Sequence, residues 1–338
     1  MPLDSGIRRN DGKRMIRRLP ECLLRLLPGV LLLAACSDHT PRRDVQELVA
    51  QISETQLRRH VAALADAGPR PAEDRRATRR VADYIRTRLL DFGYRPFEEG
   101  PATAQPDDAD AFVNILATRS GRASGAGILE VAAHYDTVAD SPGADDNASG
   151  VAAVLEIARV LSKAEVQPTI RFCFFAREET GRDGSRYHVE QIRRRNEPLD
   201  GAIVLEMVGY TSGETDTQRT PARIPLLFSP PTTGNFVAVV GNLWSGGLGN
   251  RFERARAIYA PALPLFSANR VGGFFRDALR SDHKPYWDQG YHAIMLTDTA
   301  NFRNPHYHRP TDTADTLDFR FLRHITQATA ATLLTAGR

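Results

Sequence analysis

The chain has 338 residues, 42% of them hydrophobic and 25% charged, a composition that suits a globular protein large enough to bury a core. The formal net charge of +3 arises in the first 35 residues, which hold seven of the 44 Lys and Arg and three of the 41 Asp and Glu. The remaining 37 basic and 38 acidic residues nearly cancel, so we expect no nucleic-acid partner.

The N-terminus has the pattern of an export signal. A positively charged stretch begins at Met15, and an apolar run of about ten residues follows at 26–35, too short to span a bilayer. The run ends in Leu33-Ala-Ala-Cys36, which resembles a bacterial lipobox, where the cysteine is lipidated and the chain is cut before it. We therefore expect residues 1–35 to be a signal peptide, with translation starting at Met15.

Cys36 is then the lipidated first residue of the mature protein, and residues 36–44 form a tether to the folded domain. The residue after Cys36 is Ser37 rather than Asp, and in this respect the sequence resembles lipoproteins sent to the outer membrane. We expect an exported lipoprotein of the outer membrane that faces the periplasm and touches the membrane only through its lipid. A soluble periplasmic or secreted protein is the alternative. Cys173 lies in an apolar run and is predicted to pack in the core.

Helical and strand-like patterns alternate from residue 45 onwards. Helices are predicted at 45–67, 73–92, 149–162 and 318–336, and strands at 112–118, 128–133, 169–176, 202–207 and 293–297. Residues 210–245, rich in Gly, Pro, Ser and Thr, are predicted to form loops around the mouth of a site. Continuous apolar strands between helices favour a single α/β domain over residues 45–338, with a mostly parallel (mixed) central sheet and helices on both faces.

Acidic and histidine side chains follow three of the predicted strands, and ligands of open α/β sheets gather at the carboxyl ends of strands. These side chains are His134, Asp136, Glu178, Glu179 and Glu206. The acidic loop 143–150 and the segment 305–308, with two histidines, add further candidates. Each pattern alone is more often a surface pair, a helix N-terminus or an N-cap. Together, His, Asp and Glu without an available Cys are typical of a hydrolytic zinc site.

The order of these motifs resembles metallopeptidase family twenty-eight over residues 45–338. That family includes bacterial leucyl aminopeptidases and is related to glutaminyl cyclases, glutamate carboxypeptidase and the transferrin receptor ectodomain. The resemblance rests on the motifs His134-Tyr-Asp-Thr-Val, Gly143-Ala-Asp-Asp-Asn-Ala-Ser-Gly150, Phe174-Phe-Ala-Arg-Glu-Glu179, Gly184-Ser185, Leu205-Glu-Met-Val-Gly209, Ser281-Asp-His283, Tyr307-His308 and Asp315-Thr-Leu-Asp318.

The resemblance implies a role for each matching residue. His134 and Glu206 would hold one zinc ion, Glu179 and His308 a second, and Asp146 would bridge both. Glu178 would be the general base, Tyr307 would donate to the oxyanion, and Asp136 would accept the other ring N–H of His134. Many relatives have Asp where this chain has Glu206.

The implied function is that of an aminopeptidase, which removes N-terminal residues from peptides with a water activated by two zinc ions. The implied partners are peptides with a free N-terminus. Three alternatives stay open at this point: a single-zinc enzyme like glutaminyl cyclase, a carboxypeptidase of the same fold, and an inert ectodomain that only binds partners. All five ligand positions and the Glu178-Glu179 pair are present, which favours the two-zinc peptidase.

Overall fold

The computed structural model describes residues 40–101, 111–220 and 229–337. The predicted signal peptide and the predicted lipid attachment at Cys36 lie outside the described residues. The described part contains one eight-stranded sheet, with strands in the order β1-β2-β4-β3-β5-β8-β6-β7. The strands are β1 (Phe97–Glu99), β2 (Asn114–Arg119), β3 (Ile128–His134), β4 (Thr169–Phe175), β5 (Leu199–Glu206), β6 (Val237–Gly241), β7 (Leu265–Ala268) and β8 (Ala293–Thr297).

The centre of the sheet is parallel. Strands β4, β3, β5 and β8 run in the same direction, and antiparallel strands β2 and β6 flank them. Both faces of this centre are buried: along β4, Phe172 and Phe174 face one hydrophobic core, while Cys173 and Phe175 face the other. Burial on both sides explains why these strands are continuously apolar. The predicted fold class, a mixed sheet inside an α/β domain, is confirmed.

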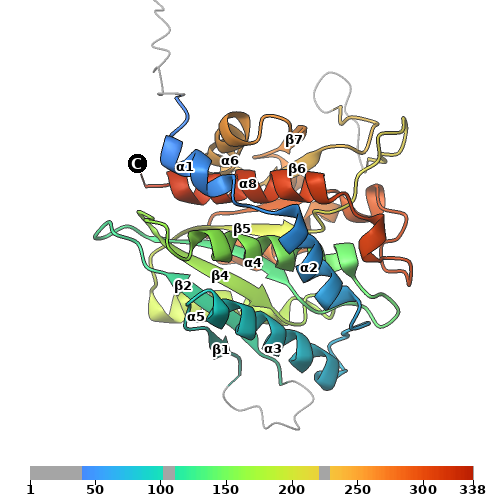
Figure 1. The fold of residues 1–338 in the computed structure, drawn as a ribbon, viewed down its shortest axis with the longest axis horizontal. Coiled ribbons are helices and arrows are strands. Elements are labelled where there is room, and N and C mark those ends of the chain that lie inside the picture. Colours follow the sequence, from blue (N-terminus) through green and yellow to red (C-terminus); the bar gives the residue numbers. More distant parts are fainter. Residues whose placement is uncertain (1–39, 102–110, 221–228, 338) are drawn as a thin grey trace, which may run out of the picture. The chain divides into compact units, whose positions relative to one another are not determined.

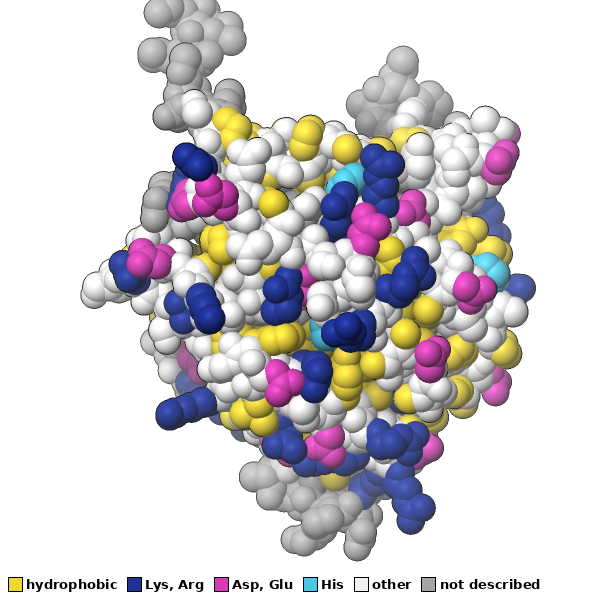
Figure 2. Space-filling view, viewed as in Figure 1, with side chains coloured by type: hydrophobic (Ala, Val, Ile, Leu, Met, Phe, Trp, Pro, Cys, Tyr) yellow, Lys and Arg dark blue, Asp and Glu magenta, His cyan; other side chains and the backbone are white. Residues whose placement is uncertain are grey.

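Helices cover both faces of the sheet (Figure 1). Six share the larger core: α1 (Arg43–Val49), α2 (Glu54–Ala65), α3 (Arg75–Asp91), α4 (Gly150–Leu161), α6 (Gly246–Tyr259) and α8 (Phe319–Thr335). The opposite face packs against α5 (Asp183–Arg195) and α7 (His283–Asp288). None of the helices in the described ranges is long and apolar enough to cross a membrane. On the face in Figure 2, basic and acidic side chains are interspersed over much of the surface.

Two of the predicted segments have a different structure from the one expected. The helix predicted at 45–67 is divided into α1 and α2, because the side chain of Ser53 accepts a hydrogen bond from the backbone N–H of Gln56 and so begins a new helix. The loop predicted at 210–245 contains the buried strand β6. Its apolar run of five residues is too short to show a clear period within Gly- and Ser-rich sequence.

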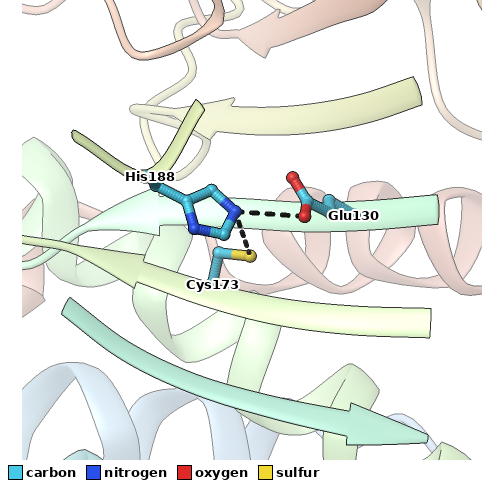
Figure 3. Close-up of side chains that lie close together, drawn as sticks. All are labelled: Glu130, Cys173 and His188. Carbon is cyan, nitrogen blue, oxygen red and sulfur yellow. Dashed lines mark hydrogen bonds and ion pairs between the residues drawn. The ribbon is translucent and has the colours of Figure 1, made fainter. Parts of the chain in front are cut away.

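A buried network of charged side chains joins β3, β4 and α5 (Figure 3). The imidazole of His188 lies between two carboxylates, with Nδ1 2.6 Å from Oε2 of Glu99 and Nε2 3.1 Å from Oε1 of Glu130. Arg171 also donates to that Oε1, and Sγ of Cys173 lies 3.9 Å from Nε2 of His188. Burial raises the pKa of the Cys173 thiol to about 12. Glu130, Cys173 and His188 lie close enough together to be considered as metal ligands. Their atoms already contact one another, and the guanidinium of Arg171 supplies the positive charge. We therefore interpret the network as structural.

Replacing His188 by alanine is expected to lower the free energy of unfolding by about 3–5 kcal/mol, because it leaves two buried carboxylates without their shared partner. Burial acts to lower the pKa of His188, but Glu130 outweighs it and raises the pKa well above its ordinary value. The contribution is therefore fully present below the unfolded-state pKa of ~6.5 and is lost as the pH rises through the folded-state value. Urea unfolding of the wild type and of His188→Ala at pH 6 measures this difference in unfolding free energy. Cys173→Ala is the control, with a loss of about 1 kcal/mol.

Candidate metal centre

The predicted ligands from the strands lie together at the carboxyl edge of the sheet. His134 is the last residue of β3, and Glu206 is the last residue of β5. Glu178 and Glu179 follow the end of β4. Since β4, β3 and β5 are adjacent and parallel, their ends bring these four side chains to one place.

Asp146 reaches the same edge from η2 (Ala144–Ser149), the helical turn between β3 and α4. The carboxylate of Asp312 accepts hydrogen bonds from the backbone N–H groups of Asp145 and Asp146, at 2.9 and 3.1 Å. The side chain of Asn147 hydrogen-bonds to the backbone on both sides of the end of β5. These contacts hold the turn against β5, so that Asp146 faces the strand ends.

Two clusters of potential ligand atoms share Asp146. In the first, Nε2 of His134 lies 3.4 Å from Oδ1 of Asp146 and 3.5 Å from Oε2 of Glu206. In the second, Nε2 of His308 lies 3.2 Å from Oδ2 of Asp146 and 3.2 Å from Oε2 of Glu179. The ligand atoms within each cluster all lie within 4.8 Å of one another. One oxygen of Asp146 thus belongs to each cluster, which is the arrangement of a bridging carboxylate.

The residues of both clusters fit divalent cations. Nε2 of His134, Nε2 of His308 and Oε1 of Glu179 are buried without a hydrogen-bond partner in the described part of the chain, which is unusual for buried polar atoms. Burial and the charge of Asp146 raise the pKa of Glu179 to about 7. Burial acts to lower the pKa of His308, but Asp146 and Glu179 outweigh it and raise the pKa to about 10. A divalent cation bound between these side chains would oppose both shifts, because it favours the carboxylate and the neutral imidazole.

Asp136 lies between His134 and the backbone that follows β4. Its carboxylate accepts hydrogen bonds from the backbone N–H groups of Glu178 and Glu179, at 3.0 and 3.2 Å. Oδ1 lies 3.6 Å from Nδ1 of His134, whereas the hydrogen bond of that ring nitrogen goes to the carbonyl oxygen of Asp136, at 3.3 Å. The two N–H groups that follow β4 therefore compete for the carboxylate. Asp136 positions the Glu178-Glu179 pair as well as facing His134.

Glu178 and Tyr307 line a cleft that opens at the two clusters. Burial, with the nearby carboxylates of Glu206 and Asp282, outweighs His134 and raises the pKa of Glu178 well above its ordinary value. Burial likewise raises the pKa of Tyr307, so its hydroxyl stays protonated and can donate a hydrogen bond. The ring of Tyr307 stacks on that of the neighbouring His308, with 3.8 Å between ring centroids.

Sequence reasoning missed two side chains that hold the ligands in place. The hydroxyl of Ser281 donates a hydrogen bond to Oε2 of Glu206, at 2.5 Å. The guanidinium of Arg70 is buried and donates to three backbone carbonyl oxygens of the loop 135–143, which connects His134 to the turn that carries Asp146. Arg70 lies in Gly68-Pro-Arg-Pro71, which signals only a turn. No local pattern marks its role.

One wall of the cleft is apolar. The cleft has a volume of about 400 Å³, which is within the range of small-molecule sites. Strands β6, β7 and β8 supply part of this wall, and aromatic side chains from the connecting segments complete it. The largest apolar side chains are Phe236, Val240, Phe266, Phe275, Met295 and Phe302. The cleft therefore combines an acidic floor with a pocket for an apolar group.

Comparisons with known proteins agree with this geometry. The model of Peptidase family M28 matches residues 114–233 and 248–333, which include all five predicted ligands. The chain belongs to peptidase family M28. Among relatives, YfbL of Escherichia coli is 33% identical over 312 residues, a match that covers 88% of this chain and 89% of YfbL. A probable zinc metalloprotease of Leptosphaeria maculans is 27% identical over 245 residues, which cover 65% of this chain and only 56% of that protein.

The fold is also that of a solved structure described as an aminopeptidase. LapA of Legionella pneumophila superposes with a TM-score of 0.68 at 19% sequence identity, covering 86% of this chain and 73% of LapA. Membership of the M28 family confirms the resemblance seen in the sequence. It also confirms the prediction that the chain is a metallopeptidase.

Proposed function

We propose that this M28 peptidase is an aminopeptidase that hydrolyses the N-terminal peptide bond with two zinc ions. The pair of clusters that share Asp146 carries the proposal. His134 and Glu206 would hold one ion, Glu179 and His308 the other, and Asp146 would bridge them. Histidine and carboxylate ligands suit catalytic zinc. The names of the fungal relative, a probable zinc metalloprotease, and of the LapA aminopeptidase support this assignment.

The side chains beside the clusters suit peptide hydrolysis. The chemistry that the two ions supply when bound is a water of lowered pKa and a polarised carbonyl group. Glu178 adjoins a ligand but belongs to neither cluster, so its carboxylate can accept the proton of the attacking water and later deliver it to the leaving amine. The hydroxyl of Tyr307 can donate to the negative charge that develops on the carbonyl oxygen.

The cleft suggests how the N-terminal residue binds. The acidic floor would attract the positively charged amino group, and the apolar wall would accept the first side chain. Burying a large apolar side chain contributes about 1.5–3 kcal/mol. We therefore expect leucine or phenylalanine to be preferred to glycine at the N-terminus by at least about ten-fold in kcat/KM.

A substrate panel assayed with and without a chelator tests the function. The panel contains leucyl-, phenylalanyl- and glycyl-p-nitroanilide, N-acetylleucyl-p-nitroanilide, an N-acetylated peptide with a free C-terminus, and a peptide with N-terminal glutamine. We expect two zinc ions per chain, hydrolysis only of the free amines, loss of activity in chelator and its return with zinc. One zinc ion with cyclisation of the glutamine would instead indicate a glutaminyl cyclase. Hydrolysis from the C-terminus of blocked peptides would indicate a carboxypeptidase, and an inert chain without metal would indicate a binding protein.

A further inference from the structure

Three arginine side chains line the cleft beside the candidate metal centre: Arg182, Arg219 and Arg280. They come from three separate segments, namely the residue before α5, the segment that follows β5, and the segment that precedes α7. The cleft that they share is also lined by Glu178, Glu179 and Tyr307, so the guanidinium groups and the candidate reactive groups face one volume.

Hydrogen bonds connect the three arginines into one group. Nη1 of Arg182 donates to the carbonyl oxygen of Leu279, the neighbour of Arg280 in the chain, at 2.9 Å. Nη2 of Arg280 donates to Oδ1 of Asn301, at 2.5 Å, and Arg219 donates to the carbonyl oxygen of the same Asn301. The three cations are thus held close together by partners that carry no charge.

The carboxylates of Asp146, Glu178, Glu179 and Glu206 line the same cleft as the three arginines. Within the described ranges, none of the three arginines forms an ion pair with a carboxylate. Asp277 also lines the cleft, but Arg280 contacts only its backbone carbonyl oxygen, at 3.3 Å. Arg171, by contrast, is paired with Glu130 and Glu197. Arg219 and Arg280 are exposed and Arg182 is half-buried, so their guanidinium groups are open to an anionic ligand that enters the cleft, above all a carboxylate that can accept two parallel hydrogen bonds.

We propose that Arg182, Arg219 and Arg280 form a subsite for a carboxylate of the peptide substrate, so that the enzyme favours short peptides with a free C-terminus. The inference rests on the proposed aminopeptidase function and adds a substrate class to it. Charge decides the orientation: the amino group is attracted to the acidic floor and repelled by the arginines, which leaves the opposite end of the peptide for them. The cleft volume of about 400 Å³ suits a peptide of a few residues.

Matched dipeptides separate this subsite from the rest of the binding site. The probes are Leu-Gly, Leu-Gly-amide and Leu-Glu-amide. We expect kcat/KM for Leu-Gly to exceed that for Leu-Gly-amide by about ten-fold, the size of one charge-assisted hydrogen bond. The ratio should fall as salt is raised, because exposed charges are screened. A gain for Leu-Glu-amide over Leu-Gly-amide would show that an acidic side chain also reaches the arginines.

The variants Arg182→Gln and Arg280→Gln test the residues directly. Each is expected to bring the ratio of Leu-Gly to Leu-Gly-amide towards one, and the double variant should remove the preference. Arg254→Gln is the matched control, because Arg254 is exposed on α6 and does not line the cleft. It should keep the wild-type ratio.

Two outcomes would overturn the inference. One is a wild-type ratio near one, and the other is a full preference for Leu-Gly in the double variant. Hydrolysis of leucyl-p-nitroanilide, which has no carboxylate, monitors the aminopeptidase function separately. If this substrate is cleaved but the ratio is one, only the carboxylate subsite is wrong. If neither the anilide nor any dipeptide is cleaved, both proposals are wrong.

Discussion

Replacing Glu178 by glutamine is expected to lower kcat by about 10²–10⁴-fold while both zinc ions stay bound. The substitution keeps the size of the side chain and removes only its ability to take up a proton. Glu178 belongs to neither cluster of ligand atoms, so the affinity for metal should change little. Steady-state kinetics with leucyl-p-nitroanilide and zinc content per chain, measured on the same preparation, separate the two effects.

Glu190→Gln is the matched control, because Glu190 lies on α5, is partly exposed and pairs with Arg194 away from the two clusters. It should retain wild-type kcat and two zinc ions. A Glu178→Gln variant that loses zinc would place this side chain among the ligands. If Glu178→Gln keeps full activity, Glu178 does not take part in the proton transfer.

Asp146→Asn is expected to abolish zinc binding in both clusters, and activity with it. Asp146 is the one residue common to the two clusters, and a neutral amide replaces the carboxylate that each ion would share. Loss of a single zinc ion would show that Asp146 belongs to one site only. Zinc content by atomic absorption, beside kcat, is the measurement.

Asp145→Asn provides the comparison for the adjacent residue. Asp145 accepts hydrogen bonds from the backbone N–H of Gly209, at 2.8 Å, and from the side chain of Asn304, at 2.6 Å, and it belongs to neither cluster. We expect both zinc ions to remain, with a loss of about 1–3 kcal/mol in unfolding free energy from the altered buried hydrogen bonds. Loss of zinc in Asp145→Asn but not in Asp146→Asn would reverse the two assignments.

Part of the candidate site could be predicted from the sequence because some of its residues have a local signal. His134 and Glu206 end apolar strands, and Glu178 and Glu179 follow another, so a parallel sheet alone brings them together. The choice of Asp146 over Asp145 and the assignment of His308 came from the family resemblance. Their roles as ligands, like those of the other site residues, stay predictions until metal binding is measured.

The supporting contacts had no such signal. Asp312 holds the turn of Asp146 from 166 positions away, and Arg70 acts on backbone carbonyl oxygens that any sequence would offer. The sequence predicted that Asp136 faces His134, but not that its carboxylate also accepts hydrogen bonds from the backbone N–H groups of Glu178 and Glu179, because a sequence does not distinguish such groups. The short elements β7 and α7 were not predicted, since four to six residues carry too little periodicity. The helices α5 and α6, of 13 and 14 residues, were not predicted either.

The spread of the five proposed ligands along the chain would couple zinc binding to folding. They lie between positions 134 and 308 and meet only when β3, β4 and β5 are paired, so an unfolded chain offers no comparable site. A ligand that binds only the folded state adds RT ln(1 + [L]/Kd) to stability, about 2.7 kcal/mol per site at 100 times its Kd. The melting temperature would then depend on free zinc concentration. In zinc-poor surroundings, unfolding and proteolysis would compete with catalysis for this chain.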